Sequence, residues 1–145
     1  MDCDTAALGT PLLFQANRLL PALRAIQHLV LPLPAPPMSE DCVAFFNHLV
    51  SRICSEVLVR VGSGETFDAA VKAILDGELA KHAISESEKW SMDNGSPQMV
   101  ALFADVGWPA KLKPQVCGLA DYVMAEILEL SMNERVQGPA KWAFE

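Results

Sequence analysis

The sequence predicts an all-α protein, and three features carry that prediction. Apolar residues recur at spacings of three and four along two long stretches, which is the repeat of a helix with one buried face. Few segments alternate apolar and polar residues with period two, as half-buried strands do. The chain has 145 residues, 51% hydrophobic and 20% charged, which is enough apolar material for one globular core. We therefore expect residues 1–145 to form a single helical domain.

The N-terminal region predicts a tail and a first helix. Residues 1–10 should form a loose tail, and residues 16–31 a helix. Pro21 would either kink this helix or lie in its first turn. Residues 32–37 read Pro-Leu-Pro-Ala-Pro-Pro, which excludes a helix and indicates an extended connection.

A long helix is expected after this connection. Ser39 can accept a hydrogen bond from a free amide, and Glu40 and Asp41 lie at the positive end of the helix dipole. Gly62-Ser-Gly64 ends the helix. Its apolar stripe runs over about five turns and comprises Val43, Phe46, Val50, Ile53, Val57 and Val61.

Three shorter helices should follow. Thr66 can cap a helix over residues 67–75, and Asp76 can cap another over residues 77–90. Residues 91–97 form a polar linker, and residues 98–106 a short helix. Gly107-Trp-Pro109 breaks that helix.

A second long helix completes the prediction. Pro114 suits its first position, and Gly138-Pro139 stops it. Its core stripe is expected to contain Val116, Leu119, Val123, Ile127 and Leu130.

Charge and cysteine content narrow the function. The chain carries 11 Lys and Arg against 18 Asp and Glu, a net charge of −7, which argues against nonspecific DNA wrapping and suits a basic partner. The four cysteines show no C-x-x-C spacing, so we expect buried reduced thiols in an intracellular protein rather than disulfides or a zinc site. Residues 19–33 are too short and too interrupted for a membrane span.

Two strings resemble the core histone family. Asp76-Gly-Glu-Leu-Ala-Lys-His-Ala-Ile-Ser-Glu86 resembles the joint between the third and C-terminal helices of histone 2B. Asp121-Tyr-Val-Met-Ala-Glu-Ile-Leu-Glu-Leu130 resembles the middle of the long helix of histone 2A. The likeness covers residues 39–90 and residues 98–137. It implies a histone fold in which a 2B-like half, residues 11–90, and a 2A-like half, residues 91–145, form a tandem pseudo-dimer.

The chain departs from the family at its C-terminal end. Histone 2A continues with a loop and a third helix, whereas here Pro-Ala-Lys-Trp-Ala-Phe-Glu145 follows the long helix. The resemblance therefore implies a truncated second fold. Either Trp142 and Phe144 cover the gap, or a partner does, as a second copy of this chain or another protein.

The resemblance also implies a partner-binding site. Histone dimers carry an acidic patch that accepts arginine side chains from chromatin proteins. The matching positions here are all acidic: Glu78 and Glu86 in the 2B-like half, and Asp121, Glu126 and Glu129 in the 2A-like half. The alternative is that these acids only solvate the outer faces of two helices.

We expect a non-catalytic, nuclear protein-interaction module of chromatin that binds basic proteins or histones and has no cofactor or metal. Glu78, His82 and Glu86 share one helical face, but His82 belongs to the histone-like string, so a structural role is favoured over metal binding. No nucleophile motif or phosphate loop indicates an enzyme.

Two other functions stay open. A nucleosome-like histone doublet would bind DNA phosphates, for which Arg18, Arg24, Lys111 and Lys113 are the candidates. A regulatory domain of a signalling protein is the third reading, because residues 19–27 loosely resemble the first helix of the tandem histone domain of the Ras exchange factor Son of sevenless.

Overall fold

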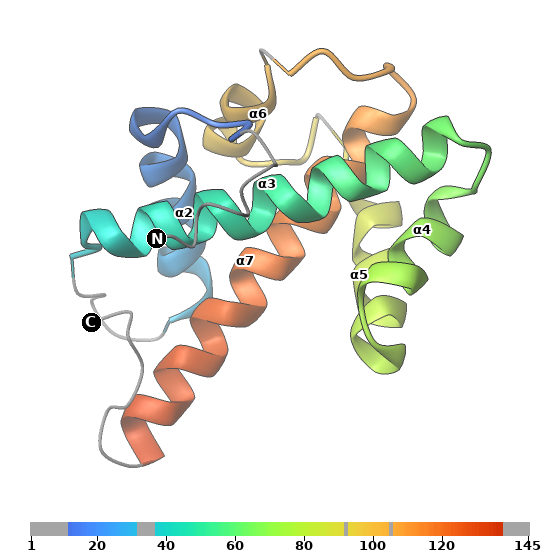
Figure 1. Ribbon diagram of the computed structural model, residues 1–145. Coiled ribbons are helices and arrows are strands. Elements are labelled where there is room, and N and C mark those ends of the chain that lie inside the picture. Colours follow the sequence, from blue (N-terminus) through green and yellow to red (C-terminus); the bar gives the residue numbers. More distant parts are fainter. Residues whose placement is uncertain (1–11, 32–36, 92, 105, 138–145) are drawn as a thin grey trace.

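The computed structural model describes residues 12–31, 37–91, 93–104 and 106–137, with side chains described as far as Leu130. Over these residues the protein is all-helical, as predicted (Figure 1). The expected tail over residues 1–10, most of the proline-rich connection, and residues 138–145 with Trp142 and Phe144 lie outside the described residues. The helices are α2 (Ala16–Val30), α3 (Glu40–Gly62), α4 (Phe67–Ile74), α5 (Gly77–Lys89), α6 (Pro97–Phe103) and α7 (Leu112–Gln137).

Side-chain caps fix two of the helix starts that the sequence predicts. Ser39 Oγ accepts a hydrogen bond from the Cys42 amide at 3.1 Å at the start of α3. Thr66 Oγ1 accepts one from the Ala69 amide at 3.1 Å at the start of α4. Asp76 occupies the N-cap position of α5, but its side chain forms no capping hydrogen bond. The prediction was therefore correct for the position of this N-cap residue and wrong for the capping hydrogen bond.

The two long helices cross, and the shorter helices pack around the crossing. In Figure 1, α7 passes behind α3 at a steep angle and continues below it, with α4 and α5 on the side of the C-terminal half of α3. Helix α5 packs along α7, and α2 packs against α3, α6 and α7. The largest fully buried side chains come from five helices, α2, α3, α4, α6 and α7, and include Leu19, Leu23, Phe46, Phe103, Leu119 and Met124. One core therefore joins both halves of the chain.

Buried thiols lie within this core. Cys42, Cys54 and Cys117 are free and buried, as expected for reduced structural cysteines. Burial raises the pKa of Cys117 to about 12. Burial, and after it the charge of Cys117, also raises the pKa of Cys54. Both therefore remain protonated and unreactive at neutral pH.

Among the described helices, α3 is long and apolar enough to cross a membrane by length and composition. Its buried side chains, Phe46, Val50 and Val57 among them, pack inside the protein. Core helices of soluble proteins pass the same test, so this observation is weak support for a membrane span.

Pro21 lies inside α2 beyond its first turn, which excludes one of its two predicted placements. Two other details of the prediction are corrected. Helix α7 begins at Leu112, two residues before Pro114. Leu130 was expected in the core, but 54% of it is exposed, because the C-terminal turns of α7 extend past the neighbouring helices (Figure 1).

Candidate protein-interaction surface

The candidate surface depends on a close approach between α5 and α7. A Cβ atom on Gly118 would lie 2.7 Å from Ser87 Cα and 2.8 Å from Trp90 Cβ. The backbones of the two helices therefore meet at Ser87 and Gly118 with no room for a side chain between them. Buried Ser87 satisfies its own hydroxyl by donating to the Ile84 carbonyl at 2.8 Å, so it needs no partner on α7.

Trp90 locks this contact from the end of α5. Its ring occupies the space where a Cβ on Gly95 would stand, and its Cβ lies against Gly118. Trp90 Nε1 donates a hydrogen bond to Asp121 Oδ2 at 3.2 Å. Asp121 is one turn after Gly118, so the same crossing that brings the backbones together also brings this carboxylate to the tryptophan.

The carboxyl group of Asp121 is costly to ionise in the folded protein. Burial raises its pKa, the hydrogen bond from Trp90 lowers it, and the charge of Glu86 raises it again, with a net rise. A carboxylate that lies partly out of water beside another carboxylate is costly to ionise. The raised pKa places Glu86 of α5 and Asp121 of α7 within electrostatic reach of each other.

Tyr122 lies among three further carboxylates. Its pKa is raised first by burial and then by the charges of Glu126, Glu86 and Glu129. Because a phenolate would be repelled by all three, its hydroxyl stays protonated and available as a donor. The α5–α7 acidic surface is the name we use for Glu86, Asp121, Glu126 and Glu129, which are grouped around Trp90 and Tyr122.

Glu78, the fifth predicted acid, lies apart from this group. It is eight residues before Glu86 on α5, which corresponds to about 12 Å along the helix axis. Its carboxylate pairs with Lys81 Nζ at 3.5 Å and with His82 Nε2 at 3.8 Å. Its side chain is 79% exposed, and its charge is not among those that raise the pKa of Tyr122. The structure therefore brings together four of the five predicted acids.

Among the side chains that the structure describes, Lys89 forms an ion pair with this surface, and its Nζ lies 3.5 Å from Glu86 Oε2. Both side chains are mostly exposed, so this ion pair is weak and a stronger cation can displace the lysine. Glu129 is exposed, and Glu126 and Tyr122 are partly exposed. The acidic surface is therefore accessible to an external guanidinium or ammonium group.

The four predicted phosphate contacts are placed differently. Arg18 Nη1 donates to the Ala101 carbonyl at 3.5 Å, which directs it toward α6. Lys113 is partly buried, and its charge lowers the pKa of Cys117. Arg24 and Lys111 are exposed, one on α2 and one just before α7. These basic side chains therefore lie on α2 and at the start of α7, whereas DNA wrapping uses many basic side chains on one face of the protein.

Trp90 and Tyr122 are the members of the surface that the sequence reasoning missed. Tyr122 directly follows Asp121 inside the histone-like string, so its neighbourhood was visible. The bond from Trp90 to Asp121 joins positions 31 apart and required knowledge of the helix crossing.

Comparison with protein-family models, with curated proteins and with solved structures gives no match for this chain.

Proposed function

We propose that this protein is a non-catalytic interaction module with a tandem histone-like fold, which binds basic segments of chromatin proteins on the α5–α7 acidic surface. The observation that carries the proposal is the contact of α5 with α7 at Ser87 and Gly118, which brings Asp121 to Trp90 and three glutamates near Tyr122. Nuclear location follows from the same proposal.

The order of the helices supports the histone-like part. A short helix, a long helix and two shorter ones, α2 to α5, have the order of the histone 2B helices. Short α6 and long α7 have the order in which histone 2A begins. The crossing of α3 and α7 (Figure 1) agrees with two central helices that pair.

The chemistry of the acidic surface supports arginine as the anchor. A guanidinium binds a carboxylate through two parallel hydrogen bonds, and it also stacks on aromatic faces. Glu126 and Glu129 follow Tyr122 by one and two turns of α7, on the same side of the helix. A guanidinium bound there could meet both carboxylates and the tyrosine ring. The protein's net charge of −7 attracts basic segments from a distance.

Charge reversal tests the proposal with a labelled arginine-rich peptide, followed by fluorescence polarisation at low salt. We expect Glu126→Lys with Glu129→Lys to weaken binding by at least about tenfold, since each charge-assisted hydrogen bond is worth about 1.5–3 kcal/mol and about 1.4 kcal/mol is a factor of ten. Circular dichroism would check that the variants remain folded.

Glu88→Lys is the matched control for Glu129→Lys. Each changes the net charge by the same amount, but exposed Glu88 follows Ser87 on α5 and belongs to the face opposite Glu86. We expect it to weaken binding less than Glu129→Lys. Equal weakening by the two would mean that only net charge matters, and unchanged affinity of the double variant would sink the proposal.

A further inference from the structure

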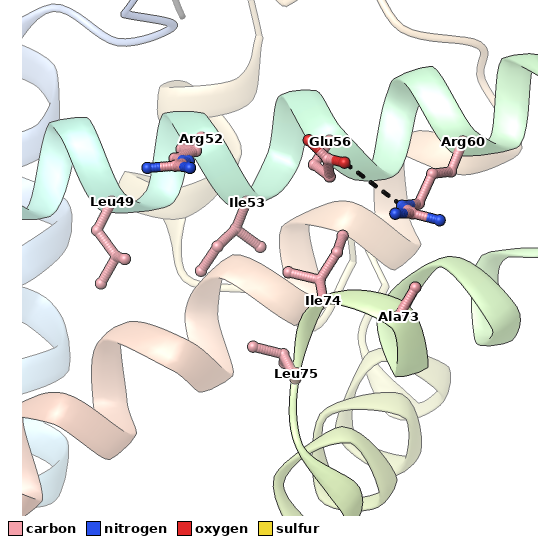
Figure 2. Close-up of a pocket in the computed structure, with 8 residues that line it drawn as sticks. All are labelled: Leu49, Arg52, Ile53, Glu56, Arg60, Ala73, Ile74 and Leu75. Atoms are coloured by element: carbon pink, nitrogen blue, oxygen red, sulfur yellow. Dashed lines mark ion pairs between the residues drawn. The ribbon is translucent and has the colours of Figure 1, made fainter. Parts of the chain in front are cut away.

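A groove between α3 and α4 is the second feature with the form of a binding site. It has a volume of about 460 Å³, within the range of ligand pockets. Figure 2 shows its aliphatic side chains pointing from the two helices toward the space between them. Its lining is made of Leu49, Arg52, Ile53, Glu56 and Arg60 from α3 with Ala73, Ile74 and Leu75 from the end of α4.

Arg60 is a structural part of this groove. Its Nε lies 3.4 Å from Glu56 Oε2, and its Nη1 lies 3.2 Å from Glu65 Oε2. The Nε atom is shielded from solvent. Two carboxylates therefore neutralise Arg60 and hold it against the loop that follows α3, as the dashed line in Figure 2 shows for Glu56.

Arg52 is the available cation of the groove. Its side chain is exposed and stands apart from the Glu56–Arg60 pair in Figure 2. Within the described part of the chain the structure gives Arg52 neither an ion pair nor a side-chain hydrogen bond. With Glu56 already paired to Arg60, an unmatched positive charge remains beside an apolar floor.

The apolar floor follows one side of α3. Leu49 is partly exposed and precedes Ile53 by one turn. Residues at this spacing line one side of a helix. A stripe of this kind fits the anchors of a second helix at one residue per turn, which is how amphipathic helices dock into grooves.

We infer that the α3–α4 groove binds a short acidic amphipathic helix of another protein, with apolar side chains on Leu49, Ile53 and Leu75 and a carboxylate on Arg52. The charge preference is opposite to that of the α5–α7 acidic surface. The inference does not rest on the proposed function, and the protein would hold a basic and an acidic segment at the same time.

The test uses the full chain and a designed peptide probe. The probe is a labelled helical peptide with leucines one turn apart and glutamates flanking them, and its binding is followed by fluorescence polarisation. We expect saturable binding in the micromolar range, and at least tenfold weaker binding after Arg52→Glu. Ala73→Trp should also block binding, because Ala73 is exposed at the groove and a large side chain there fills it.

Lys72→Glu is the matched control, because Lys72 is an exposed cation on α4 that does not line the groove. We expect it to change affinity less than twofold. A probe with lysines in place of the glutamates should bind wild type poorly and Arg52→Glu better, which separates a charge contact from a folding defect.

The inference would be overturned if the acidic probe showed no saturable binding, or if Arg52→Glu and Lys72→Glu lowered its affinity equally. It would also be overturned if free decanoate, a fatty acid with one carboxylate and no helix, bound more tightly than the peptide, because the groove would then suit a small ligand. The variant with Glu126→Lys and Glu129→Lys should bind the acidic probe no more weakly than wild type. The affinity of this variant for the acidic probe shows whether the substitutions disturb only the α5–α7 acidic surface or the groove as well.

Discussion

The two surfaces of this protein differ in how tightly the helices beneath them are packed. Under the α5–α7 acidic surface, two backbones touch at Ser87 and Gly118, and Trp90 closes the contact. At the α3–α4 groove, a volume of about 460 Å³ between the side chains of the two helices is unfilled. Tight packing fixes where charged groups stand, and loose packing leaves room for another side chain. The first arrangement suits charge recognition, and the second suits insertion.

The largest effect should come from separating α5 and α7. Gly118→Ala places a Cβ 2.7 Å from the Ser87 backbone, so the helices must move apart. We expect a loss of about 2 kcal/mol in the free energy of unfolding, within the usual cost of overpacking. Urea unfolding followed by circular dichroism measures it. The arginine-rich peptide should also bind more weakly, while the acidic probe should bind the folded variant as before.

Gly62→Ala is the control, because it is the same substitution at the end of α3, where a Cβ would meet nothing within 4 Å. It should leave stability unchanged or raise it by up to about 1 kcal/mol, since alanine restricts the unfolded chain. Equal stability of the two variants would mean that the α5–α7 contact is not tight.

The helices were predictable from sequence because their causes are local. The apolar spacing of α3 and the hydroxyls of Ser39 and Thr66 act within a few residues, and the structure confirms both caps. Leu130 shows the limit of this reasoning. It continues the apolar repeat of α7, but the repeat cannot show that the neighbouring helices end before it.

The candidate surface was predictable only in part, for the same reason. Each acid was visible in the sequence, and the resemblance to histones grouped them. The contact of Gly118 with Ser87, the bond from Trp90 to Asp121, and the distance of Glu78 from the others depend on how two helices cross. The groove depends on where the side chains of α3 and α4 leave space between them, which apolar spacing along one helix does not reveal.

The helix starts of the two regions offer an intermediate effect. Thr66→Ala removes the hydrogen bond to the Ala69 amide at the start of α4, and we expect a loss of about 1 kcal/mol. Asp76→Ala at the start of α5 removes only a charge near the helix dipole, because no capping bond exists there, and should cost about 0.5 kcal/mol. Urea unfolding compares the two.

Hydrogen exchange sharpens this comparison by reporting each helix alone. The Ala69 amide should exchange faster in Thr66→Ala, and affinity for the acidic probe should fall with it, since α4 forms one wall of the groove. Asp76→Ala should leave the exchange rate of the Ala69 amide and the affinity for the acidic probe unchanged. A larger loss of stability from Asp76→Ala than from Thr66→Ala would contradict the capping geometry.

The smallest effect concerns the electrostatic cost of the acidic surface. The folded pKa of Asp121 is raised above the unfolded value of about 3.9. The folded state therefore binds the proton more readily, so Asp121 favours folding below pH 3.9 and this contribution is lost as pH rises through the folded pKa. Asp121→Asn removes the charge and keeps an oxygen for Trp90 Nε1. We expect it to be more stable than wild type at pH 7, by about 0.5 kcal/mol, and equal at pH 3.

Glu129→Gln is the comparison for Asp121→Asn, because it removes a charge from the same surface at an exposed position. It should weaken binding of the arginine-rich peptide and change the free energy of unfolding little. If Asp121→Asn gains stability at pH 7 while it loses peptide affinity, the protein keeps a destabilising carboxylate at a place where a partner's guanidinium would neutralise it. A loss of stability at pH 7 would instead show that the ionised form of Asp121, held by Trp90, supports the fold.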